Sequence, residues 1–283
     1  MKRRLTALLG VCLFGMLTLA GCTGGGTSAA APASAGPRKV APAGTSGSPQ
    51  AGGPSAGGSA PTETVMTIGS SVAAGWGDAP GKGGYLARAF RQLSAAGPTQ
   101  YRVVSDAYGG VTGTEIAPQY PRWLARVKPN IVVISWGGMD DLTNHTSLPD
   151  FRAVVRREIR LALAAGAAVF IVTPPVTPAA YLNGLNALPY LYFTAEMNVA
   201  QSLHNPNVYV FDVFDQMLAY MKQHNRPYTD YMADGWHANA AGNELAGNLL
   251  LGDMQAVFGN QPVTVHPTSA AGGAPPEKAA ARR

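Results

Sequence analysis

The sequence of 283 residues predicts an α/β fold, a three-layer α/β/α sandwich in which helices cover both faces of a five-stranded parallel sheet. Three observations support this prediction. Short runs rich in β-branched residues alternate with longer segments of helical character about five times between residues 62 and 260. The predicted strands are apolar along most of their length, as strands are when both faces of their sheet are covered. The region is also long enough for one well-cored domain.

Five segments have the length and composition of strands, at residues 64–68, 101–105, 130–135, 168–173 and 208–213. Six segments have helical character, at residues 85–95, 117–127, 150–165, 190–204, 215–224 and 240–257. Pro121 falls inside the second of these helices, where we expect it to interrupt the helix or to occupy its first turn. Ligands of such sheets bind at the carboxyl ends of the strands, so the loops that follow the strands should carry the functional residues.

The first 22 residues have the features of a bacterial lipoprotein signal peptide. Positions 2–4 are basic, residues 5–20 are apolar and uncharged, and Leu19-Ala20-Gly21-Cys22 resembles a lipobox. Cys22 is therefore the predicted lipidation site, and we expect the protein to lie outside the cytoplasm, attached to the cell membrane. The alternative is a retained N-terminal anchor, although the apolar stretch is somewhat short for a spanning helix of about 20 residues.

Two segments flank the predicted domain of residues 63–260. Gly, Ala, Pro, Ser and Thr dominate residues 23–62, so this segment cannot bury enough apolar surface to offset the entropy of ordering it. We expect a flexible tether there. Residues 261–283 have a similar composition with a charged end, and we expect them to be disordered.

Charge and cysteine content exclude several classes of function. The net charge of +5 includes three basic leader residues, so the mature chain has 18 basic against 16 acidic residues, or about +2. The sequence has no Lys/Arg cluster that predicts nucleic-acid binding. Cys12 lies in the leader and Cys22 carries the predicted lipid, so no thiol remains for a disulfide, a cysteine nucleophile or a cysteine-based zinc site. We expect the protein to use no metal or cofactor and to be a monomer.

Two segments carry residues suited to nucleophilic catalysis. Ser71 follows the first strand in a turn that should expose its hydroxyl near a helix N-terminus, where positive dipole can hold a developing anion. Asp234 precedes His237 by three residues and can accept the imidazole Nδ1–H, which leaves Nε2 free to take a serine proton. Taken separately, the segments are equally typical of a plain turn and of an Asp that caps the last helix.

Together these segments resemble the first and last sequence blocks of the SGNH/GDSL hydrolases. Gly69, Ser71 and Gly75 match the pattern Gly-Asp-Ser-x-x-x-Gly, although Ser70 stands where Asp is usual. The block Asp-x-x-His is matched in full by residues 234–237. The resemblance covers nearly the whole predicted domain.

This resemblance implies a flavodoxin-like sandwich, no metal, and ester hydrolysis or acyl transfer. Ser71 would be the nucleophile, His237 the base and Asp234 the residue that orients the base.

The resemblance also implies an oxyanion hole that begins with the backbone N–H of Ser71. The second family block supplies a glycine N–H, and Val111-Thr112-Gly113-Thr114 looks like the usual Ile-Ser-Gly-Asp-Thr. Gly113 is therefore the preferred donor. Gly110 is the alternative, because the register of a glycine-rich loop is not fixed by one sequence.

The third family block, usually Gly-x-Asn-Asp, supplies an Asn side chain to the oxyanion. Matching Gly138-Met139-Asp140-Asp141 puts Asp140 in the Asn position, whereas a register from Gly137 would put Met139 there and lose the donor. Loss of one donor costs two to three orders of magnitude in rate, about 2.7–4 kcal/mol. A slow esterase, an acyltransferase with a differently completed hole, and a degenerate carbohydrate-binding module all remain open.

The prediction of the substrate depends only on where the domain is expected to lie, outside the cell and on a tether. A tethered domain outside the cell meets extracellular polysaccharide, so O-acetyl esters of such polymers are the first expectation and small lipid esters the second. Trp76 and Trp236 flank the proposed serine and histidine, and each is expected either in the core or in the wall of a pocket. Residues 181–185 are expected to overhang the site and are a candidate lid.

Overall fold

A computed structural model describes residues 60–181 and 187–267 of the protein. The predicted leader, Cys22, most of the tether and the end of the chain lie outside the described residues. Among the helices of the described part, none has both the length and the hydrophobicity needed to span a membrane.

The core of the fold is a five-stranded sheet in which every neighbouring pair of strands is parallel. Its strands are β1 (Thr62–Gly69), β2 (Gln100–Ser105), β3 (Ile131–Ser135), β4 (Ala168–Val172) and β5 (Val208–Phe211). Their order across the sheet is β2-β1-β3-β4-β5, the order of flavodoxin-like folds. The predicted fold class is confirmed.

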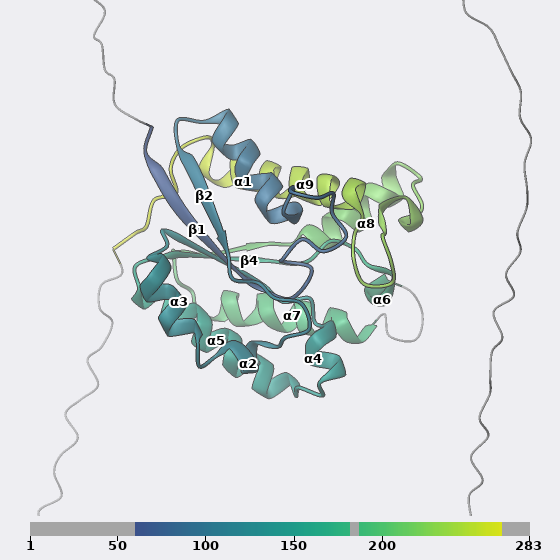
Figure 1. The fold of residues 1–283 in the computed structure, drawn as a ribbon, viewed down its shortest axis with the longest axis horizontal. Coiled ribbons are helices and arrows are strands. Elements are labelled where there is room, and N and C mark those ends of the chain that lie inside the picture. Colours follow the sequence, from purple (N-terminus) through teal and green to yellow (C-terminus); the bar gives the residue numbers. More distant parts are fainter. Residues whose placement is uncertain (1–59, 182–186, 268–283) are drawn as a thin grey trace, which may run out of the picture. The chain divides into compact units, whose positions relative to one another are not determined.

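Helices cover both faces of the sheet (Figure 1). One face carries α1 (Gly84–Ala96), α8 (Val213–Gln223) and α9 (Ala240–Phe258). The other carries α2 (Gly113–Ile116), α3 (Tyr120–Val127), α5 (Leu148–Ala164) and α7 (Ala187–Ser202). Shorter elements lie in the loops, namely α4 (Met139–Thr143), α6 (Pro178–Tyr181) and a 3-10 helix at Tyr228–Tyr231.

The central strands β3 and β4 are buried along their whole length, as is the second half of β1, because side chains on both faces of the sheet enter a core. Successive side chains of a strand point to opposite faces. Val65 and Val133 therefore belong to the core beneath α1 and α9, whereas Met66 and Val132 belong to the core above α5 and α7, and all four are fully buried.

The helix at α3 starts later than predicted. Pro121 lies in its first turn, where a missing backbone N–H is tolerated. Residues 117–119 form a turn that follows the separate short helix α2. Val213, predicted to end the last strand, is instead the first residue of α8, because the Asp212 side chain accepts the N–H of Asp215 and caps that helix.

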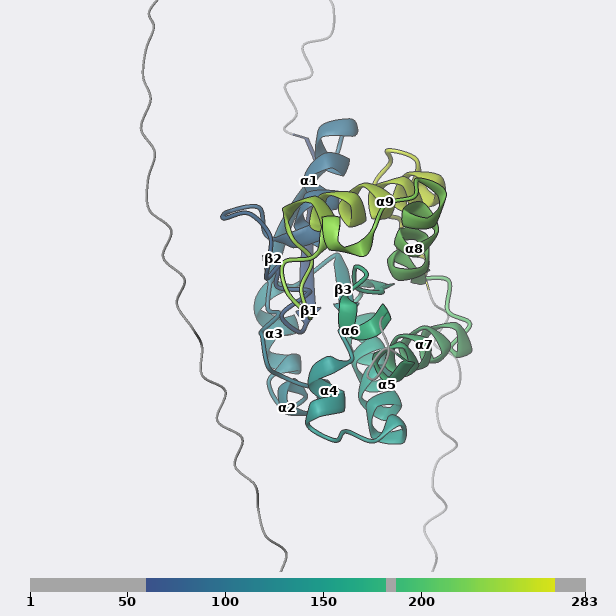
Figure 2. The ribbon, with the colours of Figure 1, turned by 90° about the vertical axis from the view of Figure 1, so that its right-hand side faces the viewer.

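Parallel strands bring the loops after β1, β2, β3 and β4 to one edge of the sheet. Figure 2 views the domain from the right-hand side of Figure 1 and shows α6 between the two helical layers, with α4 beside α2 and α5. The predicted functional residues come from this group of loops and from the segment before α9.

Candidate active site

Ser71 is positioned by the close packing of β1 against β3. Gly69 ends β1 with a φ of 144°, and a Cβ on it would lie 2.0 Å from the carbonyl oxygen of Ser135. Only glycine fits there. The chain then turns sharply, with the N–H of Ala74 donating to the Ser70 carbonyl at 3.0 Å and that of Trp76 donating to the Ser71 carbonyl at 3.0 Å.

The expected helix N-terminus behind Ser71 is not present. Residues 71–77 form turns, and α1 begins only at Gly84. The sequence suggested a helix because strand-to-helix turns are usual in this fold, but the positive φ values of Gly75 and Gly77, 83° and 84°, break the helical path. Any stabilisation of an anion at Ser71 must therefore come from individual N–H groups.

The structure brings Ser71, His237 and Asp234 into one hydrogen-bonded series. His237 Nε2 lies 2.9 Å from Ser71 Oγ, and His237 Nδ1 lies 2.9 Å and 3.1 Å from the two carboxylate oxygens of Asp234. Ser71 and His237, which are in contact, lie 166 positions apart in the chain. The three-residue spacing lets Asp234 contact the His237 side chain because the backbone between the two residues folds around the carboxylate.

The carboxylate of Asp234 is held in place by backbone donors. Its Oδ1 accepts the N–H of Trp236 at 2.7 Å and that of His237 at 2.8 Å. Burial raises the pKa of Asp234, but the hydrogen bonds from the His237 side chain and from the two backbone N–H groups outweigh it and leave the pKa below its ordinary value. Asp234 therefore stays ionised and can orient the imidazole and stabilise its protonated form.

Ser71 and His237 line a cavity of about 340 Å³. A cavity of this size fits a small ligand. The loops after β1 to β4 supply most of its wall. The lining residues are Ser70, Ser71, Val72, Trp76, Gly109, Gly110, Gly137, Met139, Asp140, Thr143, Pro174, Thr177, Trp236 and His237.

Gly113, the preferred oxyanion donor, is not part of this cavity. It begins α2 and is buried against α5, where a Cβ would lie 2.7 Å from Val154 Cγ1. Gly110, the alternative, lines the cavity with a φ of 77° and open space around its α-carbon. Of the two candidates, Gly110 and not Gly113 lies at the cavity, because the Thr112 capping box draws Gly113 into a helix.

Asp140 lies in the cavity wall, and so does Met139, the residue that the other register puts in the Asn position. Gly110, in the loop after β2, lines the same cavity. Burial raises the pKa of Asp140 and nearby Glu115 adds to this, whereas His237 and the Gly110 N–H act in the other direction. The pKa remains above its ordinary value. Asp140 therefore puts a carboxyl group with a raised pKa into the same cavity as Ser71 and His237.

Three further carboxyl groups lie buried behind this wall, around Trp136. Trp136 donates its indole N–H to Glu158 at 3.0 Å and its backbone N–H to Glu196 at 3.4 Å. Burial raises the pKa of Glu158 to about 8 and that of Asp141 to about 6, and raises that of Glu196 as well. Sequence reasoning missed Glu158 and Glu196, since neither belongs to an acidic cluster or to a recognisable motif.

Aromatic side chains border the cavity. The Trp76 ring lies 5.6 Å from the His237 ring, and a Cβ on Gly109 would lie 2.5 Å from the same indole. Trp76 is 56% exposed and Trp236 is 43% exposed, so both are rim residues and not core. Of the predicted lid, residues 182–185 lie outside the described residues, whereas Pro174 and Thr177 before them do line the cavity.

Comparison with known families identifies one match. The model of the GDSL-like Lipase/Acylhydrolase family matches residues 67–245, which include all four loops described above and the segment before α9. No curated protein matches the chain significantly.

Solved structures share the fold at low sequence identity. Axe2, an acetylxylan esterase from Geobacillus stearothermophilus, is 18% identical with a TM-score of 0.58, and the alignment covers 69% of this chain and 96% of that one. LAE5, an alpha/beta hydrolase enzyme from the metagenome of Lake Arreo, Spain, is 17% identical with a TM-score of 0.57 and coverages of 71% and 97%. The catalytic mutants of Axe2 replace a serine, an aspartate and a histidine, the aspartate three positions before the histidine.

Proposed function

Because the chain belongs to the GDSL-like lipase/acylhydrolase family, whose members are serine hydrolases, we propose that it is an esterase that removes acetyl and other small acyl groups from carbohydrate. The observation that carries this proposal is the hydrogen-bonded series Ser71–His237–Asp234 at a cavity of about 340 Å³. The same spacing of aspartate and histidine in the catalytic mutants of Axe2 supports it.

In the proposed reaction, Ser71 Oγ attacks the ester carbonyl carbon while its proton passes to His237 Nε2. The tetrahedral intermediate collapses when the C–O bond to the alcohol breaks, and His237 returns the proton to the departing oxygen. Water then attacks the acyl-Ser71 ester with His237 again as base, and the acid is released. Asp234 stays ionised and holds the imidazolium.

The oxyanion in both steps is held by the N–H groups of Ser71 and Gly110. Asp140 lines the same cavity, so the oxyanion forms either with the Asp140 carboxylate turned away or with Asp140 in its protonated form. The protonated acid would donate a third hydrogen bond, as the Asn of related enzymes does.

We propose that the alcohol part of the ester is a carbohydrate because of the side chains at the rim of the cavity. Trp76 and Trp236 line the cavity of about 340 Å³ and present exposed indole rings. Flat aromatic surfaces beside a cavity suit the apolar faces of a sugar ring. Axe2, which shares the fold, is an acetylxylan esterase, and this supports the same substrate class.

The test is release of acetate from acetylated xylo-oligosaccharides, compared with long-chain acyl esters. We expect activity on the first and little on the second. Trp236→Ala should raise KM for the oligosaccharide severalfold more than KM for p-nitrophenyl acetate, because only the oligosaccharide reaches the rim. Val257→Ala removes a side chain that is 53% exposed on α9 and serves as the matched control.

Activity confined to long-chain esters would overturn the carbohydrate proposal. Acyl transfer to an added sugar in preference to water would instead identify an acyltransferase with the same acyl-Ser71 intermediate, and sugar binding without turnover would identify a binding module.

We also propose that the protein acts outside the cytoplasm with a lipid on Cys22. The support is the leader sequence, with its basic start, its apolar stretch and its lipobox-like end at Cys22.

A further inference from the structure

Positive charge is concentrated on one of the two helical layers. The four helices α2, α3, α5 and α7 of this layer carry six arginines, all on α3 and α5, against the exposed Glu115 and Asp150 and the buried Glu158 and Glu196. On the opposite face, α1, α8 and α9 together carry three basic and three acidic residues. The nearly neutral sequence thus folds into a domain with one basic face, which is made of Arg122, Arg126, Lys128, Arg152, Arg156, Arg157 and Arg160.

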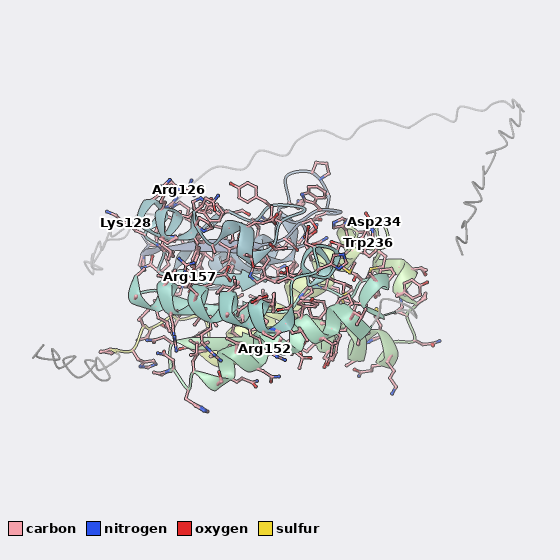
Figure 3. The ribbon with its side chains drawn as sticks, turned by 90° about the horizontal axis from the view of Figure 1, so that it is seen from below. Arg126, Lys128, Arg152, Arg157, Asp234 and Trp236 are labelled. Carbon is pink, nitrogen blue, oxygen red and sulfur yellow. The ribbon has the colours of Figure 1, made fainter. Side chains whose placement is uncertain are left out.

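The cations of this basic face are exposed, except for the half-buried Arg156. Figure 3 looks onto this layer and shows Arg126, Lys128, Arg152 and Arg157 spread over it, with Asp234 and Trp236 at the far end. Within the described residues, Arg126 pairs with Asp106, and Arg156 donates to Ser202 Oγ at 3.4 Å. The other five form no ion pair with a described residue and are available to a partner.

The partner that fits this face is an extended anionic surface. Arg152, Arg156 and Arg160 recur every four residues, so they form a row along α5 of roughly 12 Å. Arginine binds phosphate and carboxylate in a bidentate manner. The large exposed apolar side chains of the described residues all lie outside α3 and α5, so the face is suited to charged headgroups and not to insertion into hydrocarbon.

The chain enters the domain beside this face. Thr64, near the start of β1, donates its N–H to Asn130 Oδ1 at 2.8 Å and accepts the Asn130 N–H at 2.9 Å. Asn130 follows Lys128, the C-cap of α3, by two residues. The tether that leads back to Cys22 therefore meets the domain next to the basic face, whereas Ser71 follows the opposite end of β1.

We propose that the basic face of α3 and α5 docks the domain on the anionic phospholipid leaflet to which its tether holds it, which rests on the lipid anchor proposed at Cys22. A tethered domain meets this leaflet continually, and each Lys or Arg near an anionic membrane surface adds to its binding. Because the cavity is built from loops beyond the carboxyl ends of the strands, docking leaves it open to carbohydrate.

The test measures co-sedimentation of the full chain carrying Cys22→Ala, which separates docking from lipidation. Vesicles of phosphatidylcholine and phosphatidylglycerol in equal parts are compared with phosphatidylcholine alone, so any apolar contribution of the leader cancels. We expect binding to the anionic vesicles that is stronger than to the neutral ones and that falls as salt is added.

The variant Arg152→Gln/Arg157→Gln/Arg160→Gln should weaken binding to the anionic vesicles by about tenfold or more. Its matched control, Lys82→Gln/Arg91→Gln/Lys222→Gln, removes three exposed cations elsewhere on the domain and should bind as the parent does. Both variants should hydrolyse p-nitrophenyl acetate like the parent, which verifies folding independently of docking.

Equal binding to neutral and anionic vesicles would overturn the proposal, as would equal losses in the two triple variants. Binding to soluble polyphosphate without binding to anionic vesicles would also overturn it, and would identify an anionic polymer as the partner.

Discussion

At the scale of single residues, Asp140 sets the conditions under which this site can work. It lines the cavity together with Ser71, Gly110 and His237. Since its pKa is raised, the protonated, donating form is present at low pH and is lost as pH rises through that pKa. His237 must be neutral to act as base. Activity should therefore peak at mildly acidic pH and fall on the alkaline side.

Asp140→Asn should remove this alkaline decline and raise kcat at neutral pH by about tenfold or more, because the amide donates a hydrogen bond at every pH. The measurement is kcat against pH for both proteins with p-nitrophenyl acetate. A broad alkaline plateau in the parent, with an Asn variant no faster, would leave Ser71 and Gly110 as the donors and remove Asp140 from the oxyanion hole.

The residues of the site were predictable to different degrees. Asp234 and His237 are three positions apart, and Ser71 follows a recognisable strand, so local patterns located them. The choice between Gly110 and Gly113 depended on whether Thr112 starts a helix, which is decided by its capping box with Glu115. Trp76 as a rim residue depended on its packing over Gly109, a contact between two loops that no local pattern reveals.

At the scale of elements, the helices α4, α5 and α7 enclose the buried carboxyls around Trp136. Glu158 has a pKa of about 8 in the folded protein against 4.5 ordinarily, so the folded state holds its proton more tightly than the unfolded state. Its contribution to stability is present below pH 4.5 and is lost as pH rises toward about 8. Asp141, with a pKa of about 6 against 3.8, acts in the same direction.

Tm should therefore fall by several degrees from mildly acidic to mildly alkaline pH, and Glu158→Gln should flatten this decline. The glutamine keeps an oxygen for the Trp136 indole N–H but cannot ionise. Glu244→Gln, at a side chain that is 64% exposed, is the control and should leave the slope unchanged. Parallel Tm curves for the parent and Glu158→Gln would show that the carboxyl does not govern the pH dependence.

Element prediction succeeded where segments were long and regular. All five strands and six helices were located, because strands buried on both faces are uniformly apolar and the helices span two turns or more. The short helices α2, α4 and α6 were missed, since four or five residues show no periodicity. Their caps and their packing on α5 and α7 determine them.

At the scale of the whole molecule, folding separates three regions that the sequence interleaves. The carboxyl ends of the strands hold the cavity, α3 and α5 hold the basic face, and the start of β1 receives the tether. The sequence predicted the first because the loops that follow parallel strands meet at one edge of the sheet, and the third because the tether directly precedes β1 in the chain. The basic face joins two helices separated by β3 and α4, and overall composition is nearly neutral, so only the fold reveals it.

Cys22→Ala should abolish lipid attachment and release the protein from the membrane into the soluble fraction at high salt. High salt screens the basic face, so any attachment that remains reports the anchor alone. Metabolic labelling with a fatty-acid analogue followed by fractionation measures both effects. Labelling that persists in the alanine variant would place the lipid elsewhere and would remove Cys22 as the anchor.

The central claim is that Ser71 is the nucleophile of a serine esterase, activated by His237 at 2.9 Å. The most direct measurement is labelling of the full chain with a fluorophosphonate probe, followed by peptide mapping, alongside hydrolysis of p-nitrophenyl acetate. We predict one modified residue, Ser71, with labelling and turnover abolished in Ser71→Ala and labelling retained in the neighbouring Ser70→Ala. A Ser71→Ala protein that still takes the label, or that hydrolyses the ester as fast as the parent, would contradict the account.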